Sequence, residues 1–376
     1  MSGGLVRARA WVPKRRNTSM TAIIKRVLSA AALLLASAGA HAQERVVVGI
    51  PGSAWNVQYA HYNFGEELGF FRDEGIKLEY ISVSGSAVLL PQVANGQVHF
   101  GIANPDLAVI ALAKGEPLPV RFVMNWLRSQ TFEFVVPEKS PIQNLADLKG
   151  KKIGVGALTW GNLPLSRAML ASVGLAANKD VEILPVGVGA AAWRRLQTGE
   201  LDALNLYVGE HSRMELAGIP IRRVPMPEQF RTIFSNGIVT SNALIEKNPK
   251  LVAGFGRALT KSWLACKENT EACVRAFWKV NAAARPTADK EAEQLRIDMR
   301  QAMFDRAQLD DFTVGGAPLY GNYPEDAWKR LVGVMHGEGQ ITRADLDLSK
   351  LYTNAFVEEF NKFDREAVAK AAKAAK

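Results

Sequence analysis

Three short loops rich in Gly, Ser and Thr carry the groups best suited to binding in this sequence. Ser84-Gly85-Ser86, Thr159-Trp160-Gly161 and Gly187-Val188-Gly189 each stand between a predicted strand and a predicted helix. Free N–H groups and the dipole at a helix N-terminus favour an anion, and hydroxyl groups add hydrogen bonds. Such loops lie at the carboxyl ends of strands, where open α/β sheets bind ligands. They therefore predict a site for a small anion, unless each loop only caps its own helix.

Aromatic and polar residues in neighbouring loops extend this candidate site. Trp55 and Trp160 both stand in polar loops after a strand, so we expect them to face each other across a ligand instead of joining the core. Glu210 follows a strand as Asn104 does, and the alternative for Glu210 is a solvated loop acid. The expected ligand-binding residues are Ser53, Trp55, Asn56, Ser84, Gly85, Ser86, Asn104, Thr159, Trp160, Gly161, Gly187 and Glu210.

The residue types that catalysis and metal binding require are scattered. The histidines that follow residue 42 are His61, His99, His211 and His336. They form no i, i+4 pair and have no cysteine at metal-ligand spacing. The chain has no G-x-S-x-G elbow and no P-loop, and the string Gly154-Val155-Gly156 completes neither a dinucleotide nor a phosphate fingerprint. We expect no catalytic residue, no metal and no cofactor.

An internal repeat indicates how these loops are positioned. ISVSGSAVLLPQVANGQVHF (81–100) aligns without a gap on LPVGVGAAAWRRLQTGELDA (184–203). Each copy is typical of a strand, a glycine-containing loop, a helix that stops at Gly96 or Gly199, and a second strand. The alternative is that any two βαβ units look alike, but a repeat of this length favours two similar α/β halves with their loops facing across a cleft.

The repeat and the run of apolar segments predict an α/β fold of two lobes with separate cores and a helical C-terminal part. We expect residues 43–131 and 236–376 to form the first lobe and residues 132–235 the second. Two crossings, near Trp126 to Thr131 and Phe234 to Gly237, would then let the lobes hinge.

The formal charge of +9 does not indicate a nucleic-acid partner. Seven of the 46 Lys and Arg residues precede residue 43, where there is no acidic residue, and the rest nearly balance the 37 acids. Almost half of the residues are hydrophobic, so a packed interior is expected.

Residues 1–42 have the pattern of an export signal. Lys25 and Arg26 precede an apolar run at 27–39, and Ala40-His41-Ala42 is a small-x-small cleavage site. The run is shorter than the roughly 20 residues that span a bilayer. We therefore expect an exported, soluble, periplasmic protein that starts at Gln43; whether the leader begins at Met1 or Met20, and which export route it takes, stays open.

The two cysteines, Cys266 and Cys273, lie in a predicted helical region of an exported chain. On one continuous helix their Cα atoms would be roughly 10.5 Å apart, too far for a disulfide. A bridge requires a break near Asn269-Thr270, with Thr270 capping a second helix. Two buried thiols are the alternative.

Several segments resemble the nitrate, sulfonate and taurine-type solute-binding proteins of ABC importers. The segments that carry the resemblance are LGFFRDEGIKLEYI (68–81), QVANGQVHFG (92–101), NLADLKGKKIGV (144–155), LQTGELDAL (196–204), KNPKLVAGFGRAL (247–259) and YTNAFVEEFNKFD (352–364). The resemblance implies a type II periplasmic-binding fold, with ligand loops at Ser53-Ala54-Trp55, Ser84-Gly85-Ser86, Asn104 and Thr159-Trp160-Gly161.

The same resemblance implies a small-molecule ligand and an ABC permease as the partners of a monomer. The two tryptophans exceed what a nitrate or taurine site needs, so we expect a small organic anion, sulfonate-like or carboxylate, that can carry an aromatic ring. The family also resembles the pyrimidine-precursor synthases of thiamine biosynthesis, but these carry a cysteine cluster and work inside the cell. The sequence is also compatible with a thiamine-precursor binding protein and with a ligand-sensing module.

The predicted signal makes a direct test possible. N-terminal sequencing of protein from the cell envelope should begin at Gln43 or a close neighbour, because the small residues at 40 and 42 suit signal peptidase. Retention of the whole chain in the cytoplasm would contradict export.

Overall fold

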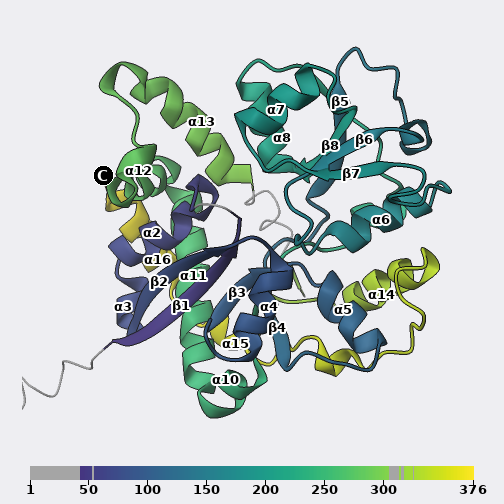
Figure 1. The fold of residues 1–376 in the computed structure, drawn as a ribbon. Helices are drawn as coiled ribbons and strands as arrows, with labels where there is room; N and C mark the ends of the chain where they lie inside the picture. Colours follow the sequence, from purple (N-terminus) through teal and green to yellow (C-terminus); the bar gives the residue numbers. More distant parts are fainter. Residues whose placement is uncertain (1–42, 53–54, 305–312, 315–316, 325) are drawn as a thin grey trace, which may run out of the picture. The chain divides into compact units, whose positions relative to one another are not determined.

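The computed structural model describes residues 43–52, 55–304, 313–314, 317–324 and 326–376 (Figure 1). Residues 44–376 form one compact unit. The expected export signal and Ser53 lie outside the described residues. No helix within the described part of the chain is long and apolar enough to cross a membrane.

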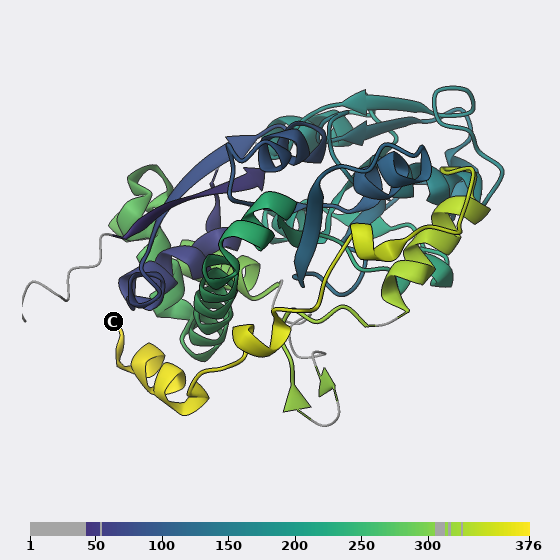
Figure 2. The same ribbon diagram turned by 90° about the horizontal axis from the view of Figure 1, so that it is seen from below.

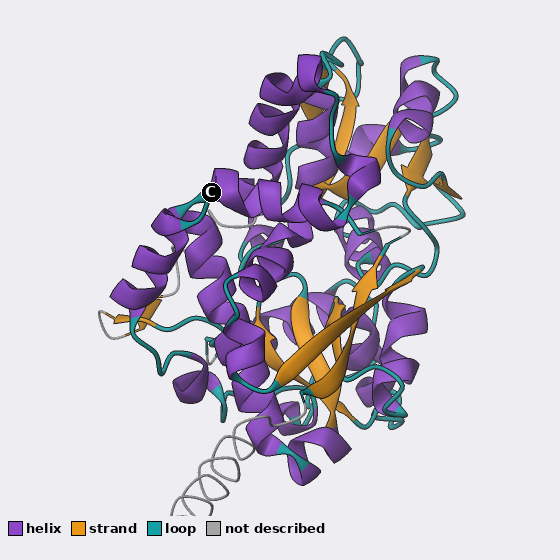
Figure 3. Ribbon diagram, turned by 90° about the vertical axis from the view of Figure 1, so that its left-hand side faces the viewer, coloured by secondary structure: helices purple, strands orange, loops and turns teal. Residues whose placement is uncertain are grey.

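The first lobe is built around a mixed five-stranded sheet. Its strands are β1 (Glu44–Pro51), β2 (Ile76–Val83), β3 (Phe100–Ala103), β4 (Val120–Asn125) and β10 (Gly237–Ser241). They lie in the order β2-β1-β3-β10-β4, with β10 antiparallel to both of its neighbours. Figure 3 shows this sheet with helices packed against it.

The second lobe repeats this arrangement. Its strands are β5 (Phe132–Pro137), β6 (Lys152–Val155), β7 (Glu182–Pro185), β8 (Ala203–Tyr207) and β9 (Ile221–Arg223), in the order β7-β6-β8-β5-β9. In each sheet the fourth strand is antiparallel and enters directly from the other lobe, at β10 and β5. The two-lobed fold with two crossings is therefore confirmed. A separate hairpin pairs β11 (Thr313–Val314) with β12 (Ala317–Pro318).

Helices of the two lobes and a helical C-terminal part cover the sheets (Figures 1 and 2). The α-helices are α2 (Ala60–Glu67), α3 (Phe70–Asp73), α4 (Ser86–Ala94), α5 (Asp106–Ala113), α6 (Leu163–Ala171), α7 (Ala190–Gln197), α8 (Val208–Leu216), α9 (Glu228–Arg231), α10 (Asn242–Lys247), α11 (Pro249–Glu268), α12 (Thr270–Val280), α13 (Glu291–Phe304), α14 (Ala327–Gly337), α15 (Val357–Phe360) and α16 (Arg365–Ala374). The 3₁₀ helices are η1 (Val57–Tyr59), η2 (Leu145–Leu148), η3 (Ala282–Ala284), η4 (Ala288–Lys290) and η5 (Leu348–Lys350).

The repeat detected in the sequence corresponds to matching elements. The run β2-α4-β3 in the first lobe answers β7-α7-β8 in the second. Gly96 and Gly199 follow the two helices with φ angles of 80° and 75°, which only glycine adopts without strain. Matching loops consequently stand at the carboxyl ends of matching strands.

The cores of the two lobes are continuous, contrary to the expectation of separate cores. One cluster of buried side chains contains Val47 and Leu89 of the first lobe together with Phe134 and Ile153 of the second. Helices α5 and α6 pack against each other and join the two sets. A second cluster belongs to the first lobe, where the rings of Phe100 and Phe255 stack with centroids 3.8 Å apart.

Cys266 and Cys273 form a disulfide, with Cα atoms 5.1 Å apart. The chain breaks at Asn269, between α11 and α12, as the bridge requires. The cap differs from the expected Thr270: the Asn269 side chain accepts from the N–H of Ala272, while the Thr270 hydroxyl donates to the carbonyl of Cys266.

Removing this bridge should destabilise the protein. For a short loop, the chain-entropy model gives a loss of about 2 to 3 kcal/mol in the free energy of unfolding for Cys266→Ala/Cys273→Ala. Urea denaturation of the variant and of the oxidised wild type measures the difference. Equal midpoints would show that the bridge does not constrain the unfolded chain.

Candidate functional site

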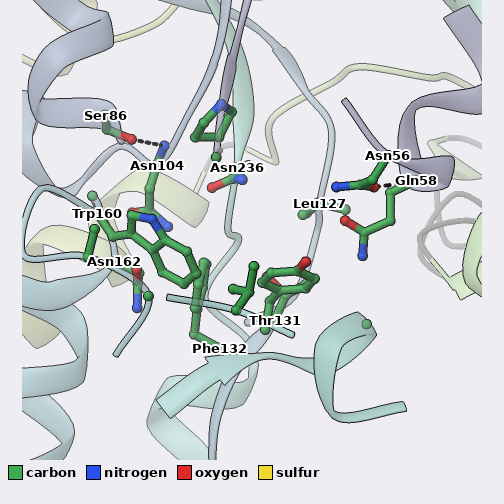
Figure 4. Close-up of a pocket in the computed structure, with 18 of the residues that line it drawn as sticks. Asn56, Gln58, Ser86, Asn104, Leu127, Thr131, Phe132, Trp160, Asn162 and Asn236 are labelled. Carbon is green, nitrogen blue, oxygen red and sulfur yellow. Dashed lines mark hydrogen bonds between the residues drawn. The ribbon is translucent and has the colours of Figure 1, made fainter. Parts of the chain in front are cut away.

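A cavity of about 560 Å³ lies between the two lobes (Figure 4). Its lining comes from the loops after the strands and from the two crossings. The lining residues are Pro51, Gly52, Asn56, Gln58, Tyr59, Ser82, Val83, Ser84, Ser86, Asn104, Trp126, Leu127, Thr131, Phe132, Gly156, Ala157, Trp160, Gly161, Asn162, Gly187, Val188, Tyr207, Val208, Gly209, Arg213 and Asn236.

The loop at 157–162 lies directly against the N-terminus of helix α4. The Thr159 carbonyl accepts from the N–H of Ala87 at 3.2 Å, and the Thr159 hydroxyl donates to the Ser84 carbonyl at 2.9 Å. A Cβ atom at Gly85 would collide with the Thr159 carbonyl, so this approach requires glycine. Gly85 and Thr159 are therefore contacts between the lobes and not lining residues. The N–H of Ala87, in the first turn of α4, is already bonded across this contact.

A second close approach follows two residues later, at Gly161. A Cβ atom at Gly161 would collide with the Ser86 side chain and crowd Asn104. The Ser86 hydroxyl accepts from the N–H of Asn104 at 3.1 Å. The cavity lining includes Ser86, Asn104 and Gly161. The backbone of the second lobe at Gly161 therefore lies against two polar residues of the first lobe.

Three aromatic rings of the second lobe form one wall of the cavity. The ring of Trp160 lies 5.7 Å from that of Phe132 and 6.2 Å from that of Tyr207. The Trp160 ring covers Gly156, where any Cβ atom would collide with it. Gly156 thus lets the tryptophan lie flat over the end of strand β6, in contact with the cavity.

The aromatic wall of the first lobe differs from the expected one. Tyr59 and Trp126 line the cavity, with ring centroids 6.0 Å apart, whereas Trp55 does not. The Trp55 ring packs 4.1 Å from that of Tyr80 and 5.1 Å from that of Tyr59, and its Nε1–H donates to Asn63. The structure thus does not place Trp55 in the lining opposite Trp160, because the indole of Trp55 packs against the neighbouring tyrosines.

Glu210 lies beneath the cavity and not in its lining. Its carboxylate is completely buried and accepts from the N–H of Gly189 at 2.5 Å and from Nε1 of Trp193 at 2.8 Å. It also accepts from Nη1 of Arg213 at 3.1 Å. Glu210 caps helix α7 and holds Arg213, which does line the cavity.

Two buried amide groups beside Trp160 lack a protein partner. The Asn104 side-chain oxygen accepts from the N–H of Asp106, which leaves Nδ2 of Asn104 without an acceptor. The Nδ2 group of Asn162 donates to Ser166, which leaves Oδ1 of Asn162 without a donor. Buried polar groups are nearly always satisfied, so these two indicate a polar partner supplied from the cavity.

Asp106 links the lobes from within the core. Its buried carboxylate, in α5, accepts from the N–H of Leu165 in the first turn of α6 at 3.0 Å. Burial is the main cause that raises the pKa of Asp106 from 3.8 to about 7, and the hydrogen bond from Leu165 opposes that rise.

The structure thus brings together most of the candidate residues. Asn56, Ser84, Ser86, Asn104, Trp160, Gly161 and Gly187 line the cavity; Trp55, Gly85, Thr159 and Glu210 do not. Sequence reasoning missed Tyr59, Phe132 and Arg213. Tyr59 lies three residues beyond Asn56, the last expected residue of its loop, and the signal for Arg213 was its i, i+3 spacing from Glu210.

Comparison with known proteins finds a family model and several relatives that this chain resembles. The family model described as NMT1/THI5 like matches residues 56–273, more than half of the chain. The riboflavin-binding protein RibY of Chloroflexus aurantiacus is 25% identical over 319 residues, which are 80% of this chain and 83% of RibY.

Two solved structures show the same fold at low identity. The alkanesulfonate-binding protein SsuA of Xanthomonas axonopodis pv. citri, bound to MOPS, has a TM-score of 0.58 and 16% identity, over 83% of this chain and 100% of that one. The desulfurization enzyme DszB has a TM-score of 0.52 and 15% identity, over 85% and 99%. The fold thus occurs in binding proteins and in an enzyme.

The buried carboxyl of Asp106 should make stability depend on pH. The folded state holds the proton with a pKa of about 7, above the unfolded value, so this stabilisation is present at low pH and is lost as the pH rises through 7. Asp106→Asn keeps the acceptor for Leu165 and removes the titration. Its free energy of unfolding, relative to wild type, should rise between pH 4 and pH 7 and then level off. A difference that is constant with pH would contradict the buried acid.

Proposed function

Because this chain belongs to the NMT1/THI5-like family, we propose that it is the solute-binding protein of an ABC importer and captures a small organic anion that carries an aromatic ring. The cavity between the lobes is the binding site. The protein is exported, acts in the periplasm as a monomer, delivers its solute to a permease in the inner membrane and does not turn it over.

The observation that carries the proposal is the set of aromatic rings that line the cavity from both lobes. Tyr59 and Trp126 belong to the first lobe, and Phe132, Trp160 and Tyr207 to the second. Aromatic side chains give a planar ring extensive apolar contact at a low entropic cost. A volume of about 560 Å³ suits an organic solute better than a bare inorganic anion.

Polar groups around these rings supply specificity. The unpartnered amides of Asn104 and Asn162 offer a donor and an acceptor at one end. Asn56, Gln58 and Asn236 add further amides (Figure 4). Such groups hydrogen-bond a solute that an apolar pocket alone would not distinguish from its analogues.

Riboflavin binding by RibY favours one second candidate, namely a neutral heteroaromatic solute such as a flavin or a thiamine pyrimidine precursor. The rings fit that class as well as an aromatic anion. An enzyme of the kind represented by DszB is another candidate. The lining side chains are amides, hydroxyls, aliphatic and aromatic groups and one guanidinium, a composition that supports binding. A ligand-sensing module would use the same cavity, and neighbouring genes for a permease and an ATPase would separate it from transport.

A thermal-shift screen tests the proposal directly. Aromatic sulfonates, aromatic carboxylates, flavins and pyrimidines are each added to the purified mature protein, because a solute that binds only the folded state raises its melting temperature. Stabilisation by an aromatic anion supports the proposal. Stabilisation by aliphatic anions alone, or turnover of a bound compound, would contradict it.

The aromatic wall gives a sharper prediction with a matched control. Trp160→Ala should weaken binding of the best ligand by about ten- to hundredfold, or about 1.4 to 2.8 kcal/mol, because one ring contact is lost. Trp55→Ala makes the same change in the corresponding loop but outside the cavity, so affinity should change by less than about threefold. Calorimetry measures both. Equal losses in the two variants would contradict a contact with the solute that Trp160 makes and Trp55 does not.

A further inference from the structure

The charge of the cavity is concentrated in one residue. Arg213, on helix α8, is the only charged side chain among the described residues that line the cavity. We infer that Arg213 determines specificity by binding the anionic group of the solute at the second-lobe end of the cavity. This inference rests on the proposed function and locates the anion, which sequence reasoning placed at the helix N-termini.

The guanidinium of Arg213 is held in place at one nitrogen. Nη1 donates to Oε2 of Glu210 at 3.1 Å, and the guanidinium carbon lies 5.6 Å from the centroid of the Trp193 ring. The side chain remains 41% exposed, whereas that of Glu210 is completely buried. A guanidinium has five N–H donors, so a fork anchored in this way retains donors for a sulfonate, carboxylate or phosphate.

Glu210 does not depend on Arg213 alone. Its other oxygen accepts from the N–H of Gly189 and from Nε1 of Trp193. The carboxylate of Glu210 therefore has three hydrogen-bond donors, of which Arg213 is one. We infer that it orients the guanidinium and leaves its other N–H groups available to the solute.

Helix α13, which packs against α8, carries the acid that competes for Arg213. Burial raises the pKa of Asp298 above its ordinary value, and hydrogen bonds from Gln294 and Trp278, and then the charge of Arg213, oppose that rise. The Asp298 oxygens already accept from Nε1 of Trp278 and from Gln294, each at 2.8 Å. Neither Glu210 nor Asp298 therefore uses all the N–H donors of Arg213, and the remaining donors can bind an anionic solute.

One of the three helix N-termini that the sequence favoured, that of α4, has an N–H that is not available to an anion. Within the loop contact described above, the Ala87 N–H of α4 is bonded to the carbonyl of Thr159. Among the lining residues that the structure describes, full positive charge thus enters the cavity only through Arg213. Charge-assisted, bidentate hydrogen bonds from an arginine to an anion are stronger than its hydrogen bonds to a neutral group.

Two pairs of compounds that differ in charge test this role. The probes are naphthalene-2-sulfonate with naphthalene-2-sulfonamide, and riboflavin 5′-phosphate with riboflavin, titrated by calorimetry into the mature protein. At least one anion should bind wild type more tightly than its neutral partner. Arg213→Gln should weaken that anion by at least tenfold and the neutral partner by less than threefold.

Further variants separate recognition from folding. Glu210→Gln/Arg213→Gln removes both charges and leaves no unpaired carboxylate, so it should show the same selective loss with a normal melting curve. Arg195→Gln removes a cation of the second lobe that pairs with Glu200 outside the cavity, and should leave both affinities unchanged. Arg213→Lys should keep part of the preference for the anion.

The outcomes are distinguishable. If a probe binds but Arg213→Gln weakens the charged and neutral members equally, or if the neutral member binds as well as the anion in wild type, the role of Arg213 is wrong and the proposed cavity stands. If none of the four compounds binds, both the aromatic-anion function and the role of Arg213 are contradicted.

Discussion

The close approach of the two lobes, at Gly85 against the Thr159 backbone and at Gly161 against the Ser86 side chain, determines the rest of the site. Only residues without a Cβ atom permit it, because a methyl group at either glycine would meet the opposite lobe. The contact brings the loop of Trp160 over the end of the first sheet. It also occupies the N–H of Ala87 in α4, which donates to the Thr159 carbonyl.

The pseudo-symmetry of the lobes explains why one cavity receives aromatic rings from both sides. In each sheet the fourth strand follows a crossing from the other lobe, and residues of both crossings line the cavity. Trp126 and Phe132 lie at the two ends of one crossing, and Asn236 lies at the other. Because the same segments connect the lobes and line the cavity, a rotation of one lobe changes the contacts of a bound solute.

The sequence predicted the paired units because the repeat is long and its glycine stops are local signals. It could not distinguish Trp160 from Trp55, because both stand at matching places after a strand. The difference arises from tertiary packing: Gly156 lets Trp160 lie against the cavity, while Tyr59 and Tyr80 cover Trp55. Separate cores were predicted wrongly because α5 and α6 join them. The sequence did not single out Arg213, because its hydrogen bond to the buried carboxylate of Glu210 is visible only in the structure.

A crystal structure of the mature protein with the solute that raises its melting temperature most is the most direct test of this account. The account predicts density for a planar ring between Trp160 and Tyr59, with hydrogen-bonding groups next to Asn104 and Asn162. A solute bound outside this cavity, or one whose ring contacts none of the five lining aromatic side chains, would contradict it.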